Sequence, residues 1–190
     1  MIHVEARPEP PSFDADVRQP GERALREGVV DLPPHWRKCI PDLLREYSRI
    51  CAYSCLYIPR VTGSSTVEHY APKSKARELA YEWSNYRLVC SLMNSRKNDF
   101  EDVLDPFEIG DDWFELEFLF MQVRPAAHLD EVTSKRIDET IKRLKLNDEE
   151  CCAARAEWYE DWKKEGLSAE FMQSRSPFIY REALRQGLAP

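Results

Sequence analysis

The sequence predicts an α+β fold, in which a strand–strand–helix core near residues 51–100 is embedded in a mainly helical domain with one or two extra strands. Short apolar segments bounded by turn residues or proline predict the strands. Apolar residues at the i, i+3, i+4, i+7 spacing of an amphipathic helix precede this core, and helical patterns recur near residues 130–190. A chain of 190 residues can bury a core of this kind in one domain.

The N-terminal segment is rich in proline, with four prolines in its first 20 residues. Because proline lacks an amide donor and restricts the residue before it, we expect residues 1–34 to form an extended arm. A single domain then covers residues 35–190. It begins with an amphipathic helix over residues 35–50, in which Pro41 lies in the first turn.

The core follows this helix in the order strand, connection, strand, helix. Its predicted elements are a knuckle or strand at residues 51–59, strands at 66–70 and 83–89, and a helix at 91–100. Glu68 and His69 are consecutive in the first full strand, where neighbouring side chains point to opposite faces. Both can serve one site only if the strand ends or bends there, and Pro72 favours such a bend.

The C-terminal half begins with the clearest alternation in the chain, WFELEFLFMQV at residues 113–123, which predicts one strand. Helical spacing follows over residues 130–146. Asn147 with Glu150 resembles a capping box for the next helix, which we expect to end at Gly166. A last short helix is predicted between Ser176-Pro177 and Gly187.

The core also carries a combination of side chains suited to phosphodiester hydrolysis, which needs a base, a cation and donors for the phosphate. His69 is the candidate base, because a neutral imidazole can accept a proton near pH 7. Glu68 and Asn94 offer oxygen ligands to one Mg²⁺ or Mn²⁺ ion, and Asn98, spaced i+4 from Asn94, is a candidate third ligand or outer hydrogen-bonding group. The candidate phosphate contacts are the basic side chains Lys73, Arg96 and Lys97.

These residues resemble the signature of HNH endonucleases of the ββα-metal class. The matching segments are VEHYAPK at residues 67–73, WSNYRL at 83–88 and CSLMNSRK at 90–97. The resemblance implies that His69 is the general base and that Glu68 and Asn94 hold the divalent metal. It also implies that Asn85 braces the loop that orients His69.

Within this class, the motifs EHxxPK, WxN and NxxK, with RIDETIKRLKLN at residues 136–147, most resemble the HNH subunit of Septu-type antiphage systems, including retron-associated relatives. That resemblance implies DNA cleavage by an effector nuclease that works in a complex with an ABC/SMC-like ATPase. Two alternatives stay open. The same site could cleave RNA such as tRNA, or a catalytically degenerate HNH scaffold could serve as a partner-binding subunit.

Two cysteine pairs that usually hold a structural zinc in this class are incomplete here. Ser54 and Met93 occupy the positions of the second cysteines, which leaves Cys51, a displaced Cys55 and Cys90 without an evident fourth ligand. We therefore expect buried thiols and apolar packing in place of Zn²⁺.

The chain is acidic, with a formal net charge of −7, although phosphate binding normally rests on a basic surface. We therefore expect the partner to supply part of the nucleic-acid surface. No apolar run approaches the roughly 20 residues that span a bilayer, and the start of the chain lacks a signal-peptide pattern, which predicts a cytoplasmic protein.

Overall fold

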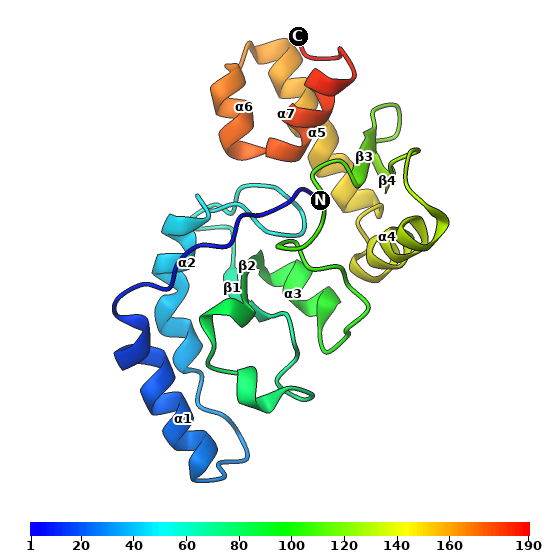
Figure 1. Ribbon diagram of the computed structural model, residues 1–190. Helices are drawn as coiled ribbons and strands as arrows, with labels where there is room; N and C mark the ends of the chain where they lie inside the picture. Colours follow the sequence, from blue (N-terminus) through cyan, green and yellow to red (C-terminus); the bar gives the residue numbers. More distant parts are fainter. The chain divides into compact units, whose positions relative to one another are not determined.

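The computed structural model describes residues 1–190 as two compact units (Figure 1). Unit 1 and unit 2 are each discontinuous in sequence. Unit 1 comprises Met1–Val4, Ile50–Tyr57 and Asp102–Pro190, and unit 2 comprises Glu5–Arg49 and Ile58–Glu101. The fold is α+β, as predicted, with two small antiparallel sheets of two strands each. The sequence predicts a single domain over residues 35–190, whereas the structure divides that stretch between the two units.

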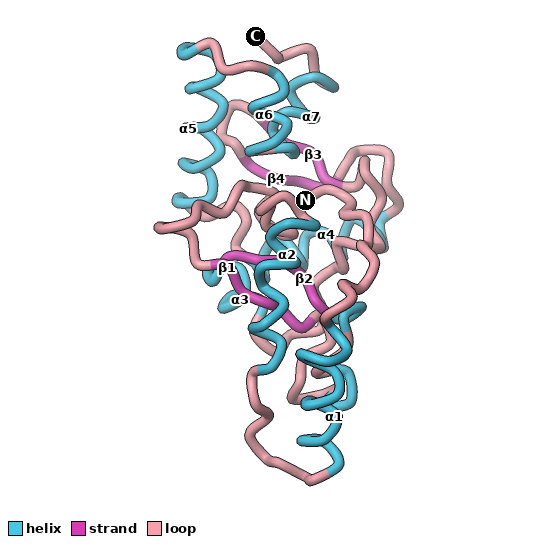
Figure 2. Tube along the Cα trace, turned by 90° about the vertical axis from the view of Figure 1, so that its left-hand side faces the viewer, coloured by secondary structure: helices cyan, strands magenta, loops and turns pink.

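Unit 2 contains a β-hairpin followed directly by a helix (Figure 2). Strands β1 (Ser65–His69) and β2 (Tyr86–Cys90) pair antiparallel, and α3 (Ser91–Lys97) packs against both. Val67 lies opposite Leu88 in the register, and both are buried, so apolar cross-strand packing holds the hairpin. The two predicted strands and the predicted helix are confirmed, with ends shifted by up to three residues.

The connection between the strands is mostly irregular. It contains two short 3-10 helices, η3 (Arg77–Leu79) and η4 (Trp83–Asn85). The sequence assigns Trp83 and Asn85 to the second strand, but their turn of 3-10 helix delays β2 until Tyr86. Asn85 therefore lies at the end of the connection, next to the strand.

The prediction of an extended N-terminal arm is wrong for residues 14–26, which form a π-helical turn, η1 (Asp14–Arg18), and α1 (Gln19–Arg26). Pro20 lies in the first turn of α1, directly after the π-helical turn. Gly21 is required at its position, because an added Cβ would meet the Tyr81 ring 2.1 Å away.

Residues 35–46 form a 3-10 helix, η2 (His35–Cys39), and then α2 (Ile40–Glu46). Pro41 lies in the first turn of α2, as predicted. The helix ends before residue 50, because Ser48 and Arg49 adopt positive φ angles of 50° and 63°. This stretch places Trp36 and Arg37 at the site described below.

The predicted single strand at residues 113–123 is wrong, since unit 1 contains a hairpin there. Strands β3 (Phe114–Glu117) and β4 (Gln122–Pro125) pair antiparallel. The Glu117 carboxylate accepts hydrogen bonds from the amides of Leu119 (2.6 Å) and Phe120 (2.9 Å), which closes the turn without glycine or proline. Because the turn residues continue the apolar pattern, the alternation alone could not reveal it.

Four helices complete unit 1: α4 (Glu131–Leu144), α5 (Glu149–Glu165), α6 (Ala169–Arg175) and α7 (Pro177–Arg185). The helix predicted at residues 130–146 and the end of α5 at Gly166 (φ 64°) are confirmed. The last helix is confirmed between Pro177 and Gly187, whereas α6 was not predicted. No helix in the chain is both long enough and apolar enough to cross a bilayer.

The predicted cap of α5 is wrong by one residue. The Asp148 carboxylate accepts the hydrogen bond from the Cys151 amide. Asn147 instead pairs through its side chain with the amide and carbonyl of Val123. Asn147 therefore ties α5 to β4.

Candidate active site

A pocket of about 690 Å³ lies in unit 2, beside β1 and the end of α3. Predicted site residues that line it are Glu68, His69, Lys73, Asn94 and Asn98. The strand, the connection and the helix thus bring five of the predicted side chains to one place. Asn85, Arg96 and Lys97 do not line it.

His69 is buried, and its Nε2 atom lies 2.9 Å from the Ala80 carbonyl oxygen. Since a carbonyl only accepts, Nε2 carries the proton and Nδ1 keeps its lone pair. Burial, with a smaller contribution from the Lys73 ammonium, lowers the pKa of His69 to about 3, so the ring is neutral at pH 7. Nδ1 lies 3.4 Å from Nζ of Lys73, and Lys73 lines the pocket.

Two aromatic rings hold the imidazole of His69. Trp36 approaches it edge to face with ring centroids 4.9 Å apart, and Tyr86 does so at 5.0 Å. The Tyr86 hydroxyl also donates to the Ala80 carbonyl at 2.8 Å. The Lys73 ammonium lies 4.8 Å from the centroid of the Trp36 ring, a cation–π contact.

Trp36 also lines the pocket, and sequence reasoning missed it. It precedes the motif by about thirty residues, and its helical setting predicts only packing. No spacing signal connects it with His69.

Asn85 is buried and bridges the connection between the two strands. Its Oδ1 accepts from the Ala71 amide at 2.7 Å, and its Nδ2 donates to the carbonyls of Ala71 (3.0 Å) and Leu79 (3.1 Å). Ala80, whose carbonyl holds His69, follows Leu79 directly. Asn85 therefore braces the connection directly before Ala80, whose carbonyl pairs with His69.

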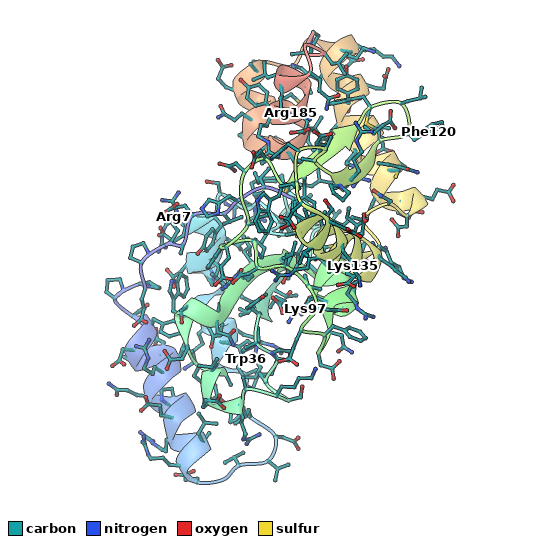
Figure 3. All side chains as sticks on the ribbon, turned by 45° about the vertical axis from the view of Figure 1, so that its right-hand side comes forward. Arg7, Trp36, Lys97, Phe120, Lys135 and Arg185 are labelled. Atoms are coloured by element: carbon teal, nitrogen blue, oxygen red, sulfur yellow. The ribbon has the colours of Figure 1, made fainter.

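Lys97 is placed differently from the phosphate contact that the sequence predicts. Its side chain is 0% exposed, and its ammonium lies 2.8 Å from Glu68 Oε1. It also donates to the carbonyls of His69 (3.0 Å) and Tyr70 (2.6 Å). All three ammonium hydrogens thus have protein oxygens as partners, so Lys97 is a buried counter-ion of Glu68. Figure 3 labels the position of Lys97 in unit 2.

Glu68 and His69 are consecutive residues at the end of β1, and both line the pocket. Strand β1 ends at His69, and Lys97 from α3 binds the carbonyls of His69 and Tyr70 while it also holds the Glu68 carboxylate. Both residues keep the regular strand pairing, Glu68 opposite Arg87 and His69 opposite Tyr86, and the strand ends directly after them.

Asn94 lies on α3, but Asn98 is beyond its last turn with φ 48° and ψ −129°. The i, i+4 argument for a shared helix face is therefore wrong for Asn98, although both residues line the pocket. The same turn adds Asp99, a pocket-lining carboxylate that sequence reasoning missed.

The donor set fits a hard divalent cation, because it combines the carboxylates of Glu68 and Asp99 with the amide oxygens of Asn94 and Asn98. No group of three or more His, Cys, Asp or Glu side chains has a metal-binding arrangement. Amide oxygens would therefore have to complete the set.

The cysteines of the incomplete zinc pattern belong to different units. Cys51 and Cys55 are buried in unit 1, whereas Cys90 ends β2 in unit 2. Burial raises the pKa of the Cys55 thiol. None of the six cysteines forms a disulfide.

Charge is distributed unevenly between the units. Unit 2 contains fifteen Lys and Arg against fourteen Asp and Glu, whereas unit 1 contains twelve against twenty. The acidic surplus therefore belongs to unit 1. The pocket of unit 2 is lined by two basic side chains, Arg37 and Lys73, which suit an anionic ligand. Arg96 is half-buried on α3 and lies outside the lining.

Comparisons with known proteins add no family assignment. No protein-family model matches the chain, and no curated protein sequence is significantly similar to it. A function must therefore be inferred from the pocket and from the motif residues that line it.

Proposed function

We propose that this protein is a metal-dependent endonuclease of the HNH type, which hydrolyses phosphodiester bonds of DNA. The observation that carries the proposal is the state of His69. Its neutral ring is fixed through Nε2, and its Nδ1 lone pair lies 3.4 Å from the Lys73 ammonium, beside a pocket that also contains Glu68 and Asn94. A fixed base next to oxygen ligands is what this hydrolysis requires.

In the proposed mechanism, His69 Nδ1 takes a proton from the water that attacks phosphorus, and the bond from phosphorus to the leaving oxygen breaks. Lys73 and Arg37 hold the phosphate oxygens. Glu68, Asn94, Asn98 and Asp99 would hold a divalent cation, which would neutralise charge on the phosphate and the leaving oxygen.

The low pKa of His69 is compatible with a role as a base. After burial, the Lys73 ammonium is the largest influence that lowers this pKa. A phosphate anion bound at Lys73 offsets that positive charge, so the basicity of Nδ1 increases when substrate arrives. Asn85 and Tyr86 meanwhile hold the Ala80 segment that orients the ring.

We also propose that the nuclease acts as the effector of an antiphage defence complex with an ABC/SMC-like ATPase. The charge distribution supports a division of labour, because unit 2, which contains the pocket, lacks the acidic surplus of unit 1. Nucleic acid would then approach unit 2, with the ATPase supplying further basic surface.

The test is cleavage of supercoiled plasmid by the complex purified from its native operon, with Mg²⁺ or Mn²⁺ present. His69→Ala should reduce the rate at least about 100-fold, because it removes the general base. His128→Ala is the control, since His128 is exposed in unit 1. Full activity of His69→Ala contradicts the mechanism, and cleavage of total tRNA but not plasmid changes the substrate to RNA.

A further inference from the structure

Lys97 and Glu68 form the most deeply buried ion pair of unit 2, with side chains 0% and 1% exposed and 2.8 Å between Nζ and Oε1. The carboxylate nevertheless belongs to a residue that lines the pocket. A buried charge needs a partner, since desolvation of an isolated ion is costly. Lys97 provides that partner when no other cation is bound.

The pocket as a whole has more positive than negative charge. Its lining contains Arg37 and Lys73 against Glu68 and Asp99, and Lys97 adds a further cation directly behind Glu68. His69 is neutral, so it does not change this balance. A divalent cation that enters the pocket is therefore repelled by these positive side chains, because a partly buried site screens charge less than bulk water does.

We propose that Lys97 is the internal counter-ion of Glu68 and that it keeps the empty pocket a weak site for divalent cations, so that metal binds firmly only together with a phosphodiester. The phosphate brings the negative charge that the pocket lacks, next to Lys73 and Arg37. Linkage requires the effect to be reciprocal, so metal must tighten nucleic-acid binding by the same factor. Lys97 is then a positioning residue that regulates metal loading.

This inference rests on the proposed metal site at Glu68, and its test measures Mn²⁺ affinity by electron paramagnetic resonance, without turnover. In the full chain without DNA, Lys97→Met should bind Mn²⁺ at least about 10-fold more tightly, because it removes the competing charge and keeps the side-chain length. Lys75→Met is the control for loss of one positive charge, since Lys75 pairs with Glu101 outside the pocket, and it should leave the affinity unchanged.

The second measurement uses His69→Ala, which retains Lys97 and prevents hydrolysis. A duplex DNA oligonucleotide should tighten Mn²⁺ binding at least about 10-fold in this variant. It tests the coupling between metal and phosphodiester even if Lys97→Met does not fold, because it needs no change at Lys97. Equal Mn²⁺ affinity with and without DNA overturns the proposal.

Other outcomes separate this inference from the proposed function. If Lys97→Met binds Mn²⁺ as weakly as the wild type or more weakly, while Glu68→Gln abolishes binding, the metal site stands and the counter-ion role is wrong. If Lys97→Met lowers only DNA affinity, Lys97 is a phosphate contact. If Glu68→Gln leaves Mn²⁺ affinity unchanged, the proposed metal site itself fails.

Discussion

His69 is held by contacts that come from three separate parts of unit 2. Trp36 belongs to η2, Ala80 to the connection and Tyr86 to β2. The sequence singles out Glu68-His69 because Asn85, Asn94 and a basic pair follow at suitable separations, whereas the dipeptide alone would be weak evidence. It cannot identify Trp36, because an aromatic residue in a helical pattern has the same appearance whether it packs in a core or orients a catalytic ring.

The Trp36 ring contacts both His69 and Lys73, so substitutions there should affect both side chains. Trp36→Leu should lower kcat for plasmid cleavage at least about 10-fold with little change in KM, because the His69 ring and the Lys73 ammonium lose a common support. Trp36→Phe should restore most of the rate, since it retains an aromatic face. Steady-state kinetics of both variants check this. If kcat falls equally in Trp36→Leu and Trp36→Phe, and Tm falls equally as well, Trp36 has a structural role only.

The sequence predicts the order strand, strand, helix of β1, β2 and α3, with ends shifted by up to three residues. Each of these segments has several consecutive residues typical of a strand or of a helix, so the prediction differs from the structure only at the ends of the elements. Predictions fail where one side chain replaces a conventional turn signal. Glu117 closes the β3–β4 turn through its carboxylate, and Asn98 ends α3 in a conformation that side chains rarely adopt.

Asn98 both ends α3 and lines the pocket, so its backbone and its side chain can be tested together. Its φ of 48° with ψ −129° favours glycine, so Asn98→Gly should keep or raise the stability of unit 2, by up to about 1 kcal/mol. The same change removes an amide oxygen from the pocket and should weaken Mn²⁺ binding in the presence of DNA. Urea unfolding and Mn²⁺ titration measure the two effects.

Lys145→Gly is the matched control for Asn98→Gly. Lys145 also has a positive φ, 49°, at the end of α4, but it belongs to unit 1. The Lys145→Gly variant should gain stability without any change in Mn²⁺ affinity. If Asn98→Gly also leaves Mn²⁺ affinity unchanged, Asn98 does not contribute a ligand.

Because His69 is buried in its neutral form, the stability of the protein depends on pH. The pKa of His69 is about 3 in the folded chain against 6.5 in the unfolded chain. The unfolded chain therefore binds a proton that the folded chain excludes, so the contribution of His69 is complete above pH 6.5. It is lost progressively as the pH falls from 6.5 towards 3.

Metal-free protein should accordingly lose about 2 kcal/mol of unfolding free energy between pH 7 and pH 5 through His69 alone. The measurement is urea unfolding of wild type and His69→Gln at both pH values, since glutamine does not titrate. The wild type should lose about 2 kcal/mol more than the variant. Parallel losses in the two proteins would show that His69 is not buried in the neutral form.

The division into two units has a consequence for dissecting the protein. Ile50–Tyr57 belongs to unit 1 although unit 2 flanks it on both sides, and Met1–Val4 belongs to unit 1 as well. The chain passes from one unit to the other four times, after Val4, Arg49, Tyr57 and Glu101. No single cut can therefore release either unit intact. A fragment of unit 2 made by truncation at either end will therefore always carry part of unit 1 or lack part of unit 2.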